Sequence, residues 1–175
     1  NVANLDGIRP AFEGVEVVVH LAAELPPTEW EKQLSTNIIG TYNVYEAARL
    51  AGVKRVVFAS SGATVNGFET IHPYDKIVEG RFEEVPQPFD KVTHEMLRPD
   101  GIYGVAKAWG ESLGRHFSDE YGLSVLCIRI GSVRRENCPQ NTREFAVYLS
   151  HRDVVQIICK CINAPESLLY DVFLA

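Results

Sequence analysis

Residues 37–61 read NIIGTYNVYEAARLAGVKRVVFASS, and this stretch decides the fold. Its first half closes a helical pattern over Thr28–Ala51, in which apolar residues recur at three- or four-residue spacing. Gly52 then provides a natural C-terminal stop for the helix. The next run, Val53–Ala59, is largely apolar and β-branched, as in a strand that is covered on both faces. A helix that leads straight into a buried strand favours a parallel sheet covered by helices.

The same alternation of strands and helices continues on either side of this stretch. The further predicted elements are a strand at Val15–His20, a helix at Ile102–Tyr121, a strand at Leu123–Ile130, a helix at Arg152–Ala164 and a strand at Leu169–Leu174. The strands are continuously apolar rather than alternating, which is typical of strands buried on both faces. The pattern therefore predicts an α/β fold with a doubly wound, Rossmann-like parallel sheet.

One long segment, from Gly62 to Gly101, interrupts this rhythm. It shows no clear helical or strand pattern and contains four of the nine prolines. A loop of this length inside a compact domain is usually functional, either as a lid or as an insertion. The alternative interpretation is a surface excursion without a role of its own.

Composition and charge exclude several classes of protein. The chain has 175 residues, of which 46% are hydrophobic and 23% are charged, as in one ordinary globular domain. Its net charge of -6 argues against nucleic acid or an anionic membrane as a partner, because both attract basic surfaces. No apolar run is long enough to cross a membrane. The four cysteines form no CxxC pair, so we expect no disulfide framework, no metal site and a reducing, cytoplasmic location.

Tyr103 and Lys107 stand out as a candidate catalytic pair. They are four residues apart near the start of a predicted helix, so their side chains share one helix face. A neighbouring ammonium favours the phenolate form and is expected to lower the pKa of the tyrosine from its usual value near 10. A tyrosine tuned in this way can exchange a proton with a substrate hydroxyl. The pair also follows a strand that ends at Ser60-Ser61, which places both features at the carboxyl edge of the sheet, where ligands bind in such folds.

Five motifs in this order resemble the extended short-chain dehydrogenases/reductases, the NAD-dependent epimerase/dehydratase group. They are HLAA at His20–Ala23, the helix containing Asn37, VFASS at Val57–Ser61, YGVAK at Tyr103–Lys107 and RIGS at Arg129–Ser132. The resemblance covers nearly the whole chain. It implies a partial NAD(P)-binding domain over residues 1–175, with an insertion at about 62–101, and an oxidoreductase that uses NAD or NADP.

The resemblance also assigns roles to individual residues. Tyr103 and Lys107 would be catalytic, and the catalytic hydroxyl would come from Ser61 or Thr64, because Gly62 occupies the position where the family usually has that hydroxyl. The expected cofactor-binding residues, in addition to Tyr103 and Lys107, are Leu21, Ala22, Ala23, Asn37, Ala59, Ser60 and Ile130. The Gly-rich turn that holds pyrophosphate in this family is absent. We therefore expect the sequence to begin within the domain; a chain that has lost cofactor binding is the alternative.

Within the family, the motifs are most similar to those of the uronate dehydrogenases, which oxidise the C1 hydroxyl of a hexuronate to an aldarolactone with NAD. This resemblance implies substrate contacts from Ser61, Gly62, Ser132 and Arg143, with Arg143 holding the substrate carboxylate as a bidentate fork. Arg134 and Arg135 compete for that role. Leu25, Gly62 and the long 62–101 segment depart from the uronate dehydrogenase pattern, so a related sugar dehydrogenase with altered specificity is also expected.

The function predicted from the sequence is therefore NAD(P)-dependent oxidation of a sugar or sugar acid, with a small molecule as the partner. Two alternatives stay open: a nucleotide-sugar epimerase or dehydratase that keeps its NAD tightly bound, and a non-catalytic scaffold that senses the dinucleotide. His20 and His151 are expected to be structural. The family commonly forms homodimers through the two helices predicted at 28–51 and 102–121, so the resemblance implies a dimer here.

Overall fold

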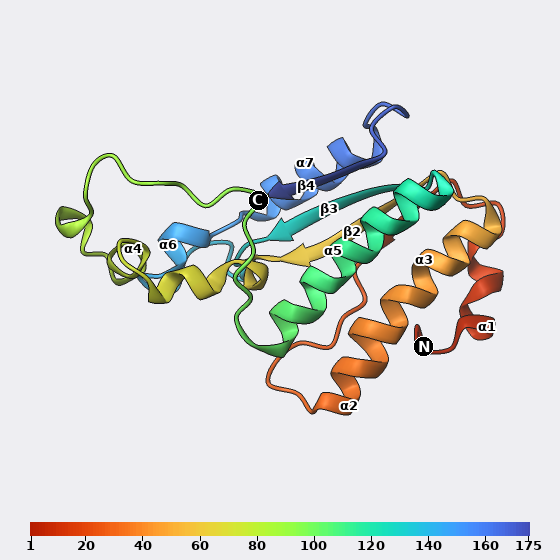
Figure 1. Ribbon diagram of the computed structural model, residues 1–175, viewed down its shortest axis with the longest axis horizontal. Helices are drawn as coiled ribbons and strands as arrows, with labels where there is room; N and C mark the ends of the chain where they lie inside the picture. The colour runs from red at the N-terminus through yellow and green to blue at the C-terminus, as the bar shows by residue number, and fades with distance from the viewer.

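The chain folds around one parallel sheet of four strands. The computed structural model describes residues 1–175. The strands pair in sequence order, β1-β2-β3-β4, and every pair is parallel (Figure 1). Their bounds are β1 at Val17–His20, β2 at Arg55–Ser61, β3 at Ser124–Ile130 and β4 at Tyr170–Leu174. The four predicted strands and the parallel α/β fold are thus confirmed.

Helices cover both faces of the sheet. The bounds of the long helices are α3 at Gly40–Ala51, α5 at Gly101–Tyr121 and α7 at His151–Ile162. Successive residues of β3 point to opposite faces: Val125 packs in the core with α3 and α5, and Leu126 packs in a second core with α7. This alternation confirms the doubly wound arrangement, because the strands are buried on both sides.

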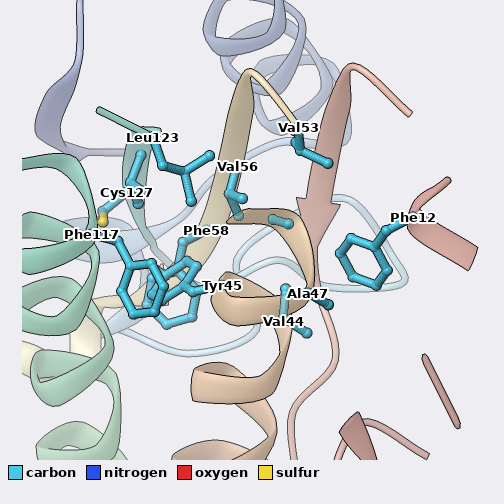
Figure 2. Packing of buried hydrophobic residues seen from close by; sticks show 12 residues of the cluster. Phe12, Val44, Tyr45, Ala47, Val53, Val56, Phe58, Phe117, Leu123 and Cys127 are labelled. Carbon is cyan, nitrogen blue, oxygen red and sulfur yellow. The ribbon is translucent and has the colours of Figure 1, made fainter. Parts of the chain in front are cut away.

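The larger of the two cores joins α3 and α5 to the sheet through aromatic side chains. Tyr45 of α3 lies between Phe58 of β2 and Phe117 of α5, with ring centroids 6.0 and 5.5 Å from theirs (Figure 2). Gly104 in the first turn of α5 approaches the end of β2 so closely that an added Cβ would meet the carbonyl oxygen of Ala63 at 2.3 Å. The close approach at Gly104 holds the start of α5 against the carboxyl edge of the sheet, and the aromatic contact at Phe117 packs its C-terminal half on the core.

The helix predicted over Thr28–Ala51 is divided into three parts. It begins as α2 at Trp30–Lys32, continues as a π-helical segment, η2, at Gln33–Ile39, and becomes regular only in α3. A π-helical turn contains an extra residue, which a three- or four-residue apolar repeat does not reveal. Such segments are frequent at functional sites, and this one contains Asn37.

The segment 62–101 is not without structure, contrary to the sequence pattern. Its helices are η3 at Gly62–Thr64, η4 at Asn66–Thr70, α4 at Tyr74–Glu79 and η5 at Phe82–Glu84. Each is too short to show an amphipathic period, which explains why sequence reasoning missed them. The same holds for α1 at Leu5–Ile8, η1 at Arg9–Phe12 and α6 at Glu144–Val147. None of the helices combines the length and the hydropathy needed to cross a membrane.

Candidate active site

The predicted functional residues gather at the carboxyl edge of the sheet. Because all four strands are parallel, the ends of β2 and β3 meet at this edge. A cavity of about 180 Å³ opens there, which we call the Ser61 cavity. Its lining residues are Ser61, Gly62, Ala63, Asn66, Ile130, Gly131, Ser132, Arg143 and Val147. A larger cavity, of about 470 Å³, lies at the opposite edge, beside Lys54 and Arg55, away from every predicted site residue.

Tyr103 and Lys107 face one another across the first turns of α5, as the sequence spacing predicts. The Lys107 ammonium lies 5.6 Å from the centre of the Tyr103 ring and 5.0 Å from that of Phe58. It donates a hydrogen bond to the carbonyl oxygen of Ala59, at 2.7 Å. Tyr103 is half-buried, and the side chain of Ser61 lies near enough to its hydroxyl to lower the pKa of the phenol. The start of α5 and the end of β2 thus bring the Tyr103 phenol, the Lys107 ammonium and the Ser61 hydroxyl together.

The pKa of Tyr103 does not follow the expectation from the sequence. Burial raises it above the usual value of 10.0, and the nearby Ser61 side chain offsets only part of this rise. The expected decrease in the pKa is therefore wrong for this arrangement. The physical reason is that the free-energy cost of removing a phenolate from water exceeds the stabilisation that the neighbouring groups provide. At neutral pH the Tyr103 side chain is a protonated phenol.

Burial acts on Lys107 in the opposite direction. The side chain is almost fully buried, and this lowers the pKa of the ammonium from 10.5 to about 8. Between these two pH values the unfolded chain holds a proton that the folded chain has lost. The stability of the fold therefore rises with pH from about 8 to 10.5, and this contribution is lost as pH falls through about 8.

We predict that Lys107→Met removes turnover without destabilising the fold. At pH 7 the buried Lys107 ammonium destabilises the fold by roughly 2–3 kcal/mol, and the substitution removes this cost. Urea unfolding should show the variant at least as stable as the wild type at pH 7, with its advantage shrinking towards pH 10. Lys91→Met, at an exposed position, is the control and should show no such pH dependence. If the stability difference between Lys107→Met and the wild type does not change with pH, the pKa of Lys107 is not lowered by burial.

The two candidate hydroxyls have different surroundings. Ser61 lines the cavity, and its oxygen accepts a hydrogen bond from the backbone N–H of Ala63 at 3.1 Å. Thr64 is fully buried, and its hydroxyl donates to the carbonyl oxygen of Ser61 at 2.9 Å. Thr64 therefore supports the turn after β2, and Ser61 is the hydroxyl that reaches the cavity.

The residues expected to bind a cofactor divide into exposed and buried groups. Leu21 and Ala22, just after β1, are exposed at the same edge as Lys107, with Ala23 partly buried beside them. Asn37 is buried: its amide accepts from the Glu24 N–H at 2.8 Å and donates to the Glu24 carbonyl at 2.9 Å. Asn37 thus holds the segment after β1 in place.

Ser60 is the least suited of the expected cofactor contacts. Its hydroxyl points into the domain and donates to the carboxylate of Glu111 on α5, at 2.5 Å. Glu111 in turn forms a buried bidentate ion pair with Arg129 of β3, at 2.8 and 2.9 Å. A third nitrogen of Arg129 donates to the carbonyl of Met96, which ties the long 62–101 segment to the back of the site.

The expected substrate-binding residues come together in the Ser61 cavity. Gly62, Ser132 and Arg143 all line it with Ser61. Arg143, however, is already engaged in a bidentate ion pair with Glu69, at 2.5 and 2.6 Å. Of its two expected competitors, Arg134 is paired with the buried Glu144. Arg135 is exposed and lines none of the cavities described above.

Sequence reasoning missed two residues of this site, Asn66 and Glu69. With its amide oriented so that both groups are satisfied, Asn66 donates to the Gly62 carbonyl at 2.8 Å and accepts from Arg143 at 3.0 Å. Both residues lie on η4, in the segment that showed no pattern. The only signal was their three-residue spacing, which places side chains on one face of a 3₁₀ turn.

His20 is a packed residue, as predicted. It is buried at the end of β1, lies 5.6 Å from the ring centre of Phe58, and forms a hydrogen bond with the hydroxyl of Thr41. Burial and the charge of Lys107 lower its pKa to about 3, so the imidazole is neutral at physiological pH. His151 opens α7 and contacts the backbone of Arg134, which also fits a structural role.

Several known proteins are similar to this chain in sequence and in fold. Residues 1–151 match the NAD dependent epimerase/dehydratase family. Uronate dehydrogenase from Pseudomonas syringae is 31% identical over 95% of this chain and 54% of its own length, and L-arabinose 1-dehydrogenase (NAD(P)(+)) from Haloferax volcanii is 41% identical over 75% of this chain and 50% of its own length. A variant of uronate dehydrogenase from Agrobacterium tumefaciens, solved in complex with NAD, superposes with a TM-score of 0.82 at 32% identity, over 99% of this chain and 58% of that chain.

These matches agree with the geometry at the carboxyl edge of the sheet. The chain spans about half the length of the curated relatives it matches. The matched range spans the strand ends and the positions of Tyr103 and Lys107. The chain belongs to the NAD dependent epimerase/dehydratase family.

Proposed function

We propose that the protein is an NAD(P)-dependent oxidoreductase that acts on a hydroxyl of a sugar or sugar acid in the Ser61 cavity. The observation that supports this most strongly is the grouping of Tyr103, Lys107 and Ser61. The side chain of Ser61 interacts with the phenol hydroxyl, and the Lys107 ammonium lies 5.6 Å from the centre of the phenol ring. This grouping stands at the edge of the sheet where ligands bind in such folds.

The chemistry of the three side chains follows from their positions. The ionised fraction of Tyr103 takes the proton of the substrate hydroxyl, and because burial raises the pKa of this phenol, that fraction is small at neutral pH and grows as pH rises. A charged Lys107 beside the ring favours the phenolate over the phenol. Ser61 can donate a hydrogen bond to the substrate oxygen as negative charge develops on it. When bound, the cofactor supplies the acceptor for the hydride that leaves the same carbon.

The structure fits a dinucleotide at this place. An ammonium has three N–H donors, and Lys107 uses one of them on Ala59, which leaves donors for the hydroxyls of a ribose. Leu21 and Ala22 are exposed beside it, at the end of β1. The similarity to an NAD(P)-dependent L-arabinose 1-dehydrogenase and to a uronate dehydrogenase solved with NAD supports the same cofactor, with NADP as the alternative.

The finer proposal is oxidation at C1 of a hexuronate to an aldarolactone. Its support is the similarity to uronate dehydrogenases and the presence of Ser132 and Arg143 in the cavity. An arginine fork is the side chain best matched to a planar carboxylate.

A panel of free sugars and sugar acids, followed by NADH absorbance, tests the proposed function. The full-length protein should reduce added NAD or NADP with at least one free sugar or sugar acid and without any nucleotide. Conversion of a nucleotide sugar without net NADH release would instead indicate an epimerase. If neither the free sugars nor the nucleotide sugars are converted, the result would favour a scaffold that only binds the dinucleotide.

We also propose that the protein forms a homodimer through the outer faces of α2–α3 and α5. Apolar side chains are exposed on both, and Trp30, Tyr42, Ile102 and Val105 are each 44–53% exposed. Exposed apolar groups on adjacent helices are typical of an interface between copies. Sedimentation of the full-length protein should give the mass of a dimer, and Val105→Glu should shift it towards the monomer.

A further inference from the structure

The Ser61 cavity contains a single charged residue. Of the nine residues that line it, only Arg143 carries a charge. A ligand with a carboxylate has therefore one partner of opposite charge in this cavity. The state of that guanidinium decides how well the cavity can bind an acid.

The guanidinium group of Arg143 already binds a carboxylate of the same chain. Its Nε and Nη2 atoms donate to the two carboxylate oxygens of Glu69, at 2.5 and 2.6 Å. This is the bidentate geometry in which arginine binds the carboxylate of a ligand. Asn66 completes the set by accepting a further hydrogen bond from Nη2.

The surroundings of Glu69 favour its ion pair with Arg143. Besides Arg143, it faces a second cavity of about 210 Å³, whose lining is mostly apolar and includes Phe68 and Ile77. A carboxylate turned towards such a wall would lose its hydrogen bonds without replacement. The two partners come from segments 74 residues apart in the sequence, but α4 and α6, which flank them, are in contact (Figure 1).

The surroundings of Arg143 are also acidic. Glu69 raises the pKa of the guanidinium most, and Asp100 and Glu144 add smaller contributions of the same sign. An incoming carboxylate therefore meets an arginine whose charge is already neutralised and whose Nε and Nη2 donors are already used. A sugar without a carboxylate meets no such competition.

We infer that Glu69 is a specificity-determining residue, which competes with the carboxylate of a sugar acid for Arg143 and so reduces the advantage that a sugar acid has over a neutral sugar in this cavity. The inference rests on the proposed function. It adds that the contrast between acidic and neutral sugars is set by a side chain of the protein. Glu69→Gln keeps the shape of this side chain but leaves the arginine charge free for a ligand.

The test compares matched sugars in the full-length protein. The kcat/KM of glucuronate relative to glucose, and of galacturonate relative to galactose, should rise about tenfold in Glu69→Gln, mainly through a lower KM for the acid. Glu84→Gln is the matched control, because it breaks an Arg–Glu pair with Arg81 in the same segment, away from the cavity. It should leave both ratios unchanged. The double variant Glu69→Gln/Arg143→Met should lose the gain.

Direct binding separates this inference from the proposed function. Calorimetry with glucuronate needs no turnover, and the acid should bind about tenfold more tightly to Glu69→Gln than to the wild type. If no sugar is oxidised but this difference is seen, the proposed function fails and the role of Glu69 stands. If the kinetic ratios and the affinity for glucuronate both stay within twofold of the wild type, the role of Glu69 is wrong.

Discussion

Tyr103→Phe is expected to lower kcat by about a thousandfold while the affinity for the dinucleotide stays within a few-fold of the wild type. The substitution removes only the hydroxyl oxygen, so the ring keeps its place beside Lys107 and in the first turn of α5. Without that oxygen no group beside Ser61 can take the substrate proton. Turnover should be followed by NADH absorbance and cofactor binding by calorimetry on the same preparation.

Tyr121→Phe provides the matched control for this experiment. It makes the same chemical change at the last residue of the same helix, where the ring packs against Phe117 and the guanidinium of Arg49 lies over it. Its kcat should equal that of the wild type. If Tyr103→Phe retained more than about a tenth of the wild-type kcat, Tyr103 would not be the group that exchanges the proton.

Glu111→Gln is expected to destabilise the fold by about 3–5 kcal/mol. The side chains of Glu111 and Arg129 are only 5% and 2% exposed. The substitution therefore leaves a buried guanidinium without its counter-charge, and it weakens the bond that Ser60 donates to the same carboxylate. Because Arg129 also holds the carbonyl of Met96, the free energy of unfolding and the order of the 62–101 segment should fall together.

A second ion pair on the same helix supplies the comparison for Glu111. Arg115 and Asp119 pair on the outer face of α5, with side chains 57% and 58% exposed, so Asp119→Asn should cost less than about 1 kcal/mol. Urea unfolding measures both variants. Replacing the buried pair as a whole, with Glu111→Leu and Arg129→Met, should recover much of the loss, because no uncompensated charge remains. Equal effects of the two carboxylate substitutions would show that the buried pair contributes no more than the exposed one.

The parts of the fold that could be predicted from the sequence are those with a repeating pattern. The strands around Val57 and Leu126 are apolar on both faces, and this dictates a sheet with helices on both sides. Tyr103 and Lys107 were found because helix geometry places residues four apart on one face. Their position at the carboxyl edge followed from the parallel order of the strands.

The parts that could not be predicted depend on contacts distant in the sequence. The pairing of Arg143 with Glu69 joins two short segments, neither of which has a periodic signal. The choice between Ser61 and Thr64 needed the path of the turn after β2, which buries the Thr64 hydroxyl. The pKa of Tyr103 needed the extent of burial, because the sequence shows the neighbouring ammonium but not the loss of water.

We propose that a dinucleotide and a sugar hydroxyl meet at the carboxyl edge of the sheet, at Tyr103 and Lys107. A crystal structure of the full-length protein with NAD tests this most directly. We predict that the Lys107 ammonium donates to the ribose next to the nicotinamide, with the Tyr103 hydroxyl beside the same ring. A dinucleotide bound at the opposite edge, in the large cavity next to Lys54 and Arg55, would contradict it.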